Sequence, residues 1–178
     1  MVDAGKVWRI VVWGGAGAVL LAAAVASRTV EGFDWTLGDF VAAGIILGTV
    51  CLGFELATRG LSGHAARAAA SLGLLGAFLT VWVNLAVGII GESNNPANLV
   101  FFPVLLIGAI GALGARFRAS GMARVMRVVT VCQVALAAGL VIAGQAPAAV
   151  LTLGIGALWA TSALLYRRAA GGQRQWTA

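Results

Sequence analysis

The stretch VVTVCQVALAAGLVIAGQAPAAVLTLGIGALWATSALLY, residues 128–166, decides the fold. Its two apolar runs, 128–143 and 147–166, contain no charged residue and are separated only by Gly144-Gln145-Ala146. An α-helix needs about 20 mostly apolar residues to cross the hydrocarbon core of a bilayer. We therefore predict two antiparallel membrane-spanning helices joined by a tight turn. Pro147 suits the first turn of the second helix, where its missing N–H does no harm.

Four earlier runs have the same character, at residues 10–26, 40–57, 68–90 and 97–115. Glycine, proline, asparagine and charged residues mark their ends, and the connections between them are short. Pro103 falls inside the fourth run and predicts a kink there. The sequence therefore predicts an all-α membrane protein, a bundle of six transmembrane helices in one domain over residues 1–178.

The composition excludes the main alternatives to a membrane protein. Of the 178 residues, 61% are hydrophobic and 10% are charged, against about 25% charged in an average soluble domain. The mean hydropathy is +0.97. A soluble chain of this size cannot bury so much apolar surface, and hydrophobicity this high also excludes disorder. Two cysteines are too few for a disulfide-rich scaffold.

The basic residues predict the orientation in the membrane, because cytoplasmic loops carry an excess of lysine and arginine. With the N-terminus inside, Arg28 lies outside and the other basic residues lie inside: Lys6, Arg9, Arg59, Arg67, Arg116, Arg118, Arg124, Arg127, Arg167, Arg168 and Arg174. The pattern predicts that both termini lie in the cytoplasm. It also explains the net charge of +6 without a nucleic-acid partner.

Three polar residues inside the predicted helices form a candidate intramembrane site, namely Glu55, Asn84 and Gln133. Such residues are costly in a bilayer and are candidates for function. Glu55 could hold a proton or cation, but a salt bridge to Arg59, one turn later, is the simpler interpretation. Asn84 and Gln133 could line a solute path. Hydrogen bonds to neighbouring helices are the commoner use of such amides.

The sequence lacks the residue sets of the common enzyme classes. His64 is the only histidine, so neither a two-histidine haem site nor a hydrolase triad is expected. Cys51 and Cys132 fit small buried hydrophobes better than metal ligands. We therefore expect no catalytic residues, no metal and no cofactor. Trp82 and Trp159 lie deep in their helices, where packing is expected and stacking on a flat quinone or pigment is the alternative.

Small residues predict close helix packing. Gly44 and Gly48 form a G-x-x-x-G motif, and Gly108, Gly111 and Gly114 recur at every third position. Such residues let helix backbones approach closely. This predicts a compact bundle with little room for a wide pore, and the same motif can also drive association with a second copy or with another membrane protein.

The densest polar run on the predicted outer face is residues 91–98, with Glu92, Asn94, Asn95 and Asn98 as candidate contact residues. Asn95-Pro96-Ala97 resembles the pore tripeptide of aquaporins, which carry two copies of it. Only one copy is present here. We favour Asn95 as the cap of the fourth helix, with Pro96 at its first position.

Two stretches carry a family resemblance. The first is Trp35-Thr36-Leu37-Gly38-Asp39-Phe40, followed by Glu55 and Arg59, and the second runs from Trp82-Val83-Asn84-Leu85-Ala86 through Gly91-Glu92 to Asn95-Pro96-Ala97-Asn98. Together they resemble a family of small, uncharacterised multi-pass inner-membrane proteins of proteobacteria. The resemblance covers residues 33–118. It implies location and topology, but no reaction, since that family has no established activity.

These features favour a non-enzymatic structural or accessory subunit of a membrane assembly. The expected partners are the lipid bilayer and either a second copy or another membrane protein. A small-solute transporter or channel that uses Glu55, Asn84 and Gln133 is the alternative. A lipid, quinone or pigment binder that uses Trp82 and Trp159 is a further one.

Overall fold

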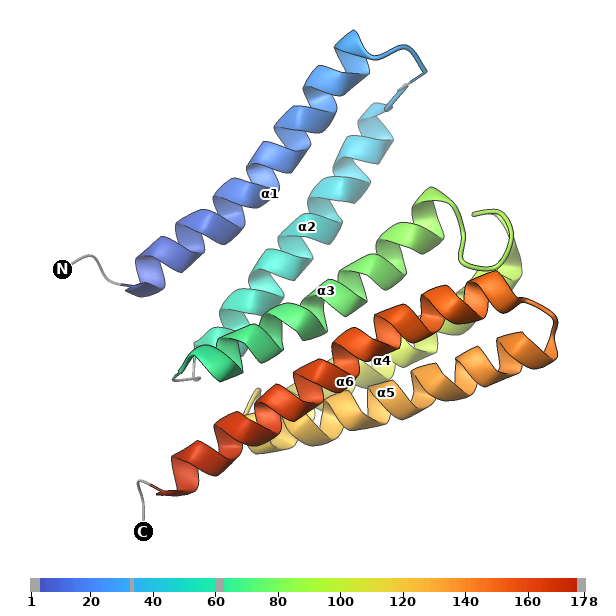
Figure 1. Cartoon of the computed structure of the whole chain (residues 1–178). Coiled ribbons are helices and arrows are strands. Elements are labelled where there is room, and N and C mark those ends of the chain that lie inside the picture. Colours follow the sequence, from blue (N-terminus) through green and yellow to red (C-terminus); the bar gives the residue numbers. More distant parts are fainter. Residues whose placement is uncertain (1–3, 33, 60–62, 176–178) are drawn as a thin grey trace. The chain divides into compact units, whose positions relative to one another are not determined.

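The chain folds into long helices (Figure 1). The computed structural model describes residues 4–32, 34–59 and 63–175, with side chains for all of these except 4–8 and 173–175. Within them all regular secondary structure is helical: α1 (Ala4–Thr29), α2 (Leu37–Thr58), α3 (His64–Ala86), the 3-10 helix η1 (Pro96–Phe101), α4 (Phe102–Gly114), α5 (Ala119–Ile142) and α6 (Ala146–Gln175). Six segments of this described part are long and apolar enough to cross a membrane, with η1 and α4 forming one of them. This confirms the predicted all-α membrane fold.

The contacts divide the chain into two compact units, where the sequence alone predicts a single domain. The hairpin unit, Met1–Glu55, contains α1 and most of α2. The four-helix unit, Leu56–Ala178, contains α3, η1, α4, α5 and α6.

Several helices extend beyond their apolar runs. Helix α5 begins at Ala119 rather than at residue 128, and α6 continues to Gln175 rather than ending at residue 166. Alanine, methionine and arginine are strong helix formers, so the arginine-bearing ends stay helical after the apolar run has ended. Arg124 and Arg127 therefore lie on a helix and not in a loop. The side chains of Lys6 and Arg174 lie outside the described part of the chain.

Helix α3 begins and ends four residues earlier than predicted, at His64 rather than residue 68 and at Ala86 rather than residue 90. The apolar run itself continues to Ile90. Gly88 and Gly91 adopt left-handed backbone with φ of 79° and 66°, a conformation that glycine tolerates best. A Cβ on Gly88 would lie 2.5 Å from the backbone of Glu92. The local turn therefore overrides the helical pattern of the run.

Pro103 lies at the start of a helix and not within one. The structure has η1 up to Phe101 and then α4, with Pro103 in the first turn of α4. Proline is tolerated there because the first N–H groups of a helix have no intrahelical partner. The kink predicted from Pro103 is thus a junction between a 3-10 helix and an α-helix.

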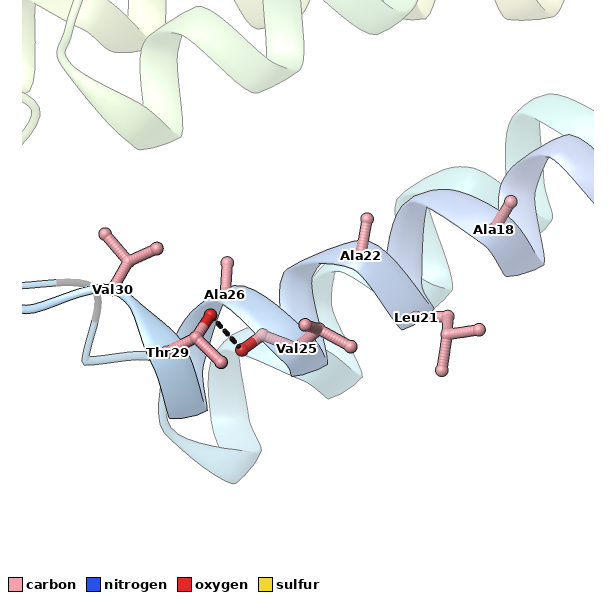
Figure 2. Close-up of a pocket in the computed structure, with 7 residues that line it drawn as sticks. All are labelled: Ala18, Leu21, Ala22, Val25, Ala26, Thr29 and Val30. Atoms are coloured by element: carbon pink, nitrogen blue, oxygen red, sulfur yellow. Dashed lines mark hydrogen bonds between the residues drawn. The ribbon is translucent and has the colours of Figure 1, made fainter.

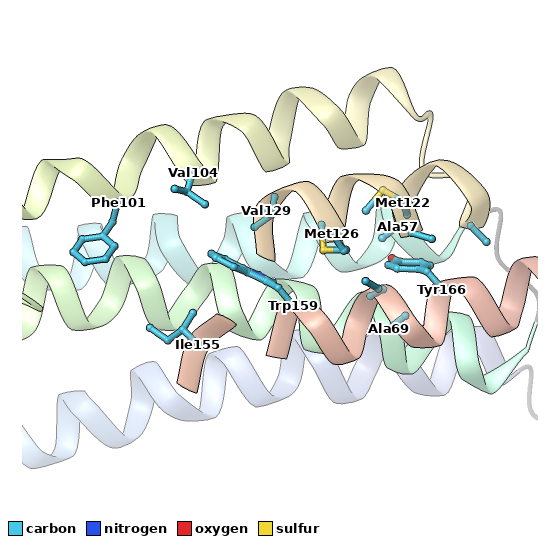
Figure 3. Close-up of a cluster of buried hydrophobic side chains, with 14 of the residues drawn as sticks. Ala57, Ala69, Phe101, Val104, Met122, Met126, Val129, Ile155, Trp159 and Tyr166 are labelled. Atoms are coloured by element: carbon cyan, nitrogen blue, oxygen red, sulfur yellow. The ribbon is translucent and has the colours of Figure 1, made fainter. Parts of the chain in front are cut away.

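The four-helix unit is built around the α5–α6 hairpin. The turn closes through Gly144, whose φ is 73°, and through the N–H of Gln145, which donates to the carbonyl of Leu140 at 2.8 Å. Helix α6 packs against both α3 and α5, and α4 packs against α5. Figure 3 shows the buried cluster between them, from Phe101 at one end to Tyr166 at the other.

Glycines set the closeness of the helices in this unit. A Cβ on Gly76 of α3 would lie 2.5 Å from Nε1 of Trp159, and one on Gly111 of α4 would lie 2.9 Å from Cγ1 of Val125. These positions therefore accept no larger side chain without movement. By contrast, a Cβ on Gly44 or Gly48 would meet nothing within 4 Å, so the G-x-x-x-G motif makes no such contact within the hairpin unit.

The start of α2 has a reciprocal cap. The carboxylate of Asp39 accepts hydrogen bonds from the N–H and the hydroxyl of Thr36, both at 2.7 Å. The N–H of Asp39 donates to the Thr36 hydroxyl at 3.4 Å. This is a capping box, in which two residues three apart satisfy each other's backbone, and it fixes where α2 begins.

Candidate functional site

The hollow that the structure presents on α1 is apolar (Figure 2). It has a volume of about 450 Å³. It is lined by Ala18, Leu21, Ala22, Val25, Ala26, Thr29 and Val30. The Thr29 hydroxyl donates to the carbonyl of Val25 at 2.9 Å and so is already satisfied. None of the predicted site residues lines this hollow, and its surface suits hydrocarbon better than a polar solute.

Glu55 forms an ion pair within the hairpin unit. Nη2 of Arg9 lies 3.3 Å from Oε1 of Glu55, and the side chains are 65% and 12% exposed. One turn away, the thiol of Cys51 donates weakly to the carbonyl of Val12 at 3.7 Å. These two contacts join the first turns of α1 to the last turns of α2. The pairing of Glu55 with Arg59 stays a prediction. The Arg59 side chain does make an interaction in the structure.

Asn84 is buried and bonded to its own helix. Its Nδ2 donates to the carbonyl of Thr80 at 2.6 Å, and the Thr80 hydroxyl donates to the carbonyl of Gly76 at 2.8 Å. Oδ1 of Asn84 is buried with no hydrogen-bond partner. A buried acceptor left unpaired costs about 1–3 kcal/mol, so this oxygen is the least satisfied part of α3.

Gln133 is fully buried between α5 and α6. Its Nε2 donates to the carbonyl of Thr152 at 3.4 Å, and its Cγ would lie 3.3 Å from a Cβ on Gly156. Oε1 of Gln133 is the second buried carbonyl oxygen without a partner. The amide therefore links two helices while keeping one acceptor unused.

The two unpartnered amide oxygens lie close to one level of the four-helix unit. The third buried oxygen without a partner, the Tyr166 hydroxyl, lies elsewhere, fourteen residues beyond Thr152 on α6. Nε1 of Trp159 donates to the carbonyl of Gly73 at 2.9 Å, which aligns α6 antiparallel to α3. Thr80 lies seven residues beyond Gly73, and Thr152 lies seven residues before Trp159. Seven residues are about two turns, so Thr80 and Thr152 share a depth. With Asn84 and Gln133 they form what we call the buried polar layer.

The sequence did not reveal Thr80 and Thr152, although both are almost completely buried. Each hydroxyl donates to the carbonyl four residues earlier, Thr152 to Ala148 at 2.7 Å, and this self-contained bond makes threonine unobtrusive in an apolar run. The four-residue spacing of Thr80 and Asn84 was the signal available. Glu55 belongs to the other unit, and Asn84 and Gln133 share no hydrogen bond in the described structure.

Trp159 is used in packing. It is 2% exposed, its N–H is bonded to Gly73, and its ring lies against Gly76. The Ser162 hydroxyl, one turn along, donates to the carbonyl of Ala69 at 2.7 Å. Trp82 stacks on Phe78 with ring centroids 5.7 Å apart. Polar groups of α6 thus fasten it to the small-residue face of α3.

The loop between α3 and η1 is folded around Asn98. Its Oδ1 accepts the N–H groups of Ile89 and Ile90 at 3.0 and 2.8 Å, and its Nδ2 donates to the carbonyl of Glu92 at 2.9 Å. Asn98 is 4% exposed. This candidate contact residue therefore supports the loop from inside and is not available to a partner.

Asn95 caps η1, as the sequence predicted. Its Oδ1 accepts the N–H of Ala97 at 3.0 Å, Pro96 occupies the first position, and Nδ2 donates to the carbonyl of Ile90 at 3.0 Å. Glu92 and Asn94 are exposed. Among the candidates in this loop, Asn95 and Asn98 hold its shape, and Glu92 and Asn94 form its surface.

The fold and the candidate residues together define a class, the helical membrane protein. Six apolar helices provide the spanning segments in the described part, and the four-helix unit provides a packed core. Comparison with protein-family models, with curated proteins and with solved structures finds no match for the chain.

Proposed function

We propose that this protein is a non-enzymatic structural or accessory subunit of a membrane assembly. The observation that supports it best is the use of polar groups in α6 for fastening helices. The N–H of Trp159 and the hydroxyl of Ser162 both donate to backbone carbonyls of α3, at 2.9 and 2.7 Å. A helix face held by backbone contacts is suited to rigidity, since it resists sliding and opening.

The proposed location is the bacterial inner membrane, with both ends of the chain in the cytoplasm. Support comes from the arginines at one end of the four-helix unit and from the positive-inside rule. The resemblance of residues 33–118 to small multi-pass inner-membrane proteins of proteobacteria is part of the same proposal.

The apolar surface of α1 supports an association. Within its spanning segment no described residue is buried, and Leu21 is 67% exposed. Lipid covers such a surface adequately, but so does a helix of a second copy or of another membrane protein. An accessory subunit requires a surface of this kind.

The test is cross-linking in the native membrane, followed by purification in mild detergent. A photoreactive residue replaces Leu21 on α1, and the matched control carries it at Leu106 on α4, which is 60% exposed. The proposal predicts a specific adduct from position 21 and a co-purifying partner or second copy. A lone monomer without adducts from either position would contradict it.

A small-solute transporter or channel is the second candidate, because Asn84 and Gln133 each keep a buried carbonyl oxygen without a partner. Lipid cannot satisfy these acceptors, whereas a passing water molecule or solute with N–H or O–H groups can. If solute moves along this route, Asn84→Leu and Gln133→Leu abolish uptake into proteoliposomes that contain the protein. The accessory role predicts no uptake in the wild type and a stably folded Gln133→Leu variant.

A further inference from the structure

The charges of the four-helix unit are strongly unbalanced. Glu92 is the only acidic residue among residues 56–178. It lies in the loop between α3 and η1, which is far along the chain from every arginine of the unit. The arginines whose side chains the structure describes in α3 to α6 and their connections are Arg67, Arg116, Arg118, Arg124, Arg127, Arg167 and Arg168.

These arginines share one end of the unit. Helices α3 and α6 are antiparallel, because Trp159 bonds to Gly73 while Ser162, later on α6, bonds to Ala69, earlier on α3. Helices α4 and α5 are antiparallel for the same reason, with Gly108 next to Val129 and Gly111 next to Val125. Helices α5 and α6 form a hairpin. Consequently α3 and α5 begin where α4 and α6 end. We call this end, with its seven described arginines, the arginine end.

The connection between α4 and α5 is firmly built at this end. Arg116 and Phe117 both have left-handed backbone, with φ of 47° and 54°, which is uncommon for residues other than glycine. Phe117 packs against the hydrophobic core, and its N–H donates to the carbonyl of Ala112 at 3.2 Å. Arg116 and Arg118, on either side of Phe117, are exposed. The half-buried Phe117 ring thus anchors the connection that presents the exposed Arg116 and Arg118.

Two further arginines of this end lie within the spanning helix α5. Arg124 and Arg127 lie in the first turns of α5 and are exposed, although α5 belongs to a segment long and apolar enough to cross a membrane. Nε of Arg127 donates to the carbonyl of Ala123 at 3.3 Å, which turns the side chain along its own helix. Arginines in this position extend toward the lipid headgroups while their stems contact hydrocarbon.

The geometry points to a binding site for anionic phospholipid headgroups at the arginine end, with Arg116 and Arg118 at its centre. A guanidinium group binds the two oxygens of a phosphate diester at once. Several arginines in a unit whose one acidic side chain, Glu92, lies in the α3–η1 loop favour a lipid whose headgroup has net negative charge over a zwitterionic one. The site needs only the membrane-spanning fold and is independent of the proposed accessory role.

The experiment measures lipid binding to the full-length protein in mild detergent, through the rise in thermal midpoint as phosphatidylglycerol is added. Phosphatidylcholine is the comparison lipid. A ligand that binds only the folded state raises the midpoint, and the rise grows with the logarithm of the ligand concentration once this exceeds the dissociation constant. We expect a rise with phosphatidylglycerol, little with phosphatidylcholine, and a smaller rise at high salt, because surface charges are screened.

Variants locate the site. Arg118→Gln weakens phosphatidylglycerol binding about fivefold, and Arg116→Asn with Arg118→Gln weakens it about 25-fold, since each surface arginine contributes about a fivefold factor. Asparagine suits position 116 because it tolerates left-handed backbone. The matched single-charge control is Arg28→Gln, in the last turn of α1, which leaves the binding unchanged.

Three results would overturn the assignment. They are equal stabilisation by both lipids, an unchanged response in the double variant, and an equal effect of inorganic phosphate at the same concentration, which would indicate a site for a free anion. If the double variant does not fold, Arg167→Gln with Arg168→Gln tests the same end. Both of these side chains are exposed and lie on the continuous helix α6, and the same 25-fold loss is expected.

Discussion

At the residue scale, the four-helix unit depends on a few side chains that contact backbone directly. Trp159 bonds to the carbonyl of Gly73 and covers Gly76, so the size of residue 76 sets the distance between α3 and α6. Asn98 has the same role for the α3–η1 loop, because it binds two backbone N–H groups that no helix satisfies. Substitutions that disturb either contact are therefore expected to lower the stability of the unit.

Gly76→Ala is expected to lower the free energy of unfolding by about 1–3 kcal/mol, because the added methyl overlaps the indole of Trp159. Gly44→Ala is the matched control. Its new methyl meets nothing within 4 Å, and alanine favours helix over glycine, so stability is unchanged or slightly higher. Reversible unfolding in detergent measures both variants. If both variants lose the same free energy of unfolding, the close contact of Gly76 with Trp159 does not limit the size of residue 76.

Asn98→Ala is expected to cost about 2–3 kcal/mol, because it leaves the buried N–H of Ile89 and that of Ile90 without their acceptor. Asn94→Ala, an exposed change in the same loop, stays within about 0.5 kcal/mol of the wild type. The same unfolding assay compares them. A loss at Asn94 as large as that at Asn98 would contradict the internal role of Asn98.

At the element scale, the sequence predicted the number and order of the spanning helices and the antiparallel α5–α6 hairpin, because long apolar runs and short turns leave few alternatives. It also predicted the Asn95 cap, since Asn95 and Pro96 are adjacent. The end of α3 at Ala86 was not predictable from hydrophobicity, because it follows from the left-handed Gly88 and from an acceptor, Asn98, further along the chain.

The candidate site was predictable only in part, because its contacts also depend on residues far apart in the sequence. Asn84 and Gln133 stood out as amides in apolar runs, but their partners Thr80 and Thr152 did not. The ion pair of Glu55 with Arg9 shows the limit most clearly. Arg9 comes from another helix, and a spacing rule within one helix cannot find it, whereas the pairing with Arg59 at one helical turn stays a prediction.

The Arg9–Glu55 pair is expected to contribute about 0.2–1 kcal/mol to the free energy of unfolding of the hairpin unit, because Arg9 is 65% exposed and solvent screens the pair. A double-mutant cycle with Arg9→Gln and Glu55→Gln measures this coupling by thermal unfolding. The coupling is expected to fall further in high salt. Zero coupling in low salt would mean that the pair does not fasten α1 to α2.

At the scale of the whole molecule, a packed unit with a basic end is combined with a hairpin whose apolar surface is exposed. This division suits a subunit that is rigid in one part and offers a surface for association in the other. In such a subunit the buried polar layer packs helices together and admits no water. The transport alternative requires water at the same level, and the two differ in one measurable property.

That property is the access of water to position 80. In a variant whose Cys51 and Cys132 are replaced by alanine, Thr80→Cys is treated with a small water-soluble thiol reagent in intact membranes. Asn94→Cys, in the exposed part of the α3–η1 loop, is the positive control. The packed scaffold predicts rapid labelling at position 94 and none at position 80. Labelling at position 80, slowed by a solute that competes for the path, would contradict the packed scaffold and establish a hydrated route through the four-helix unit.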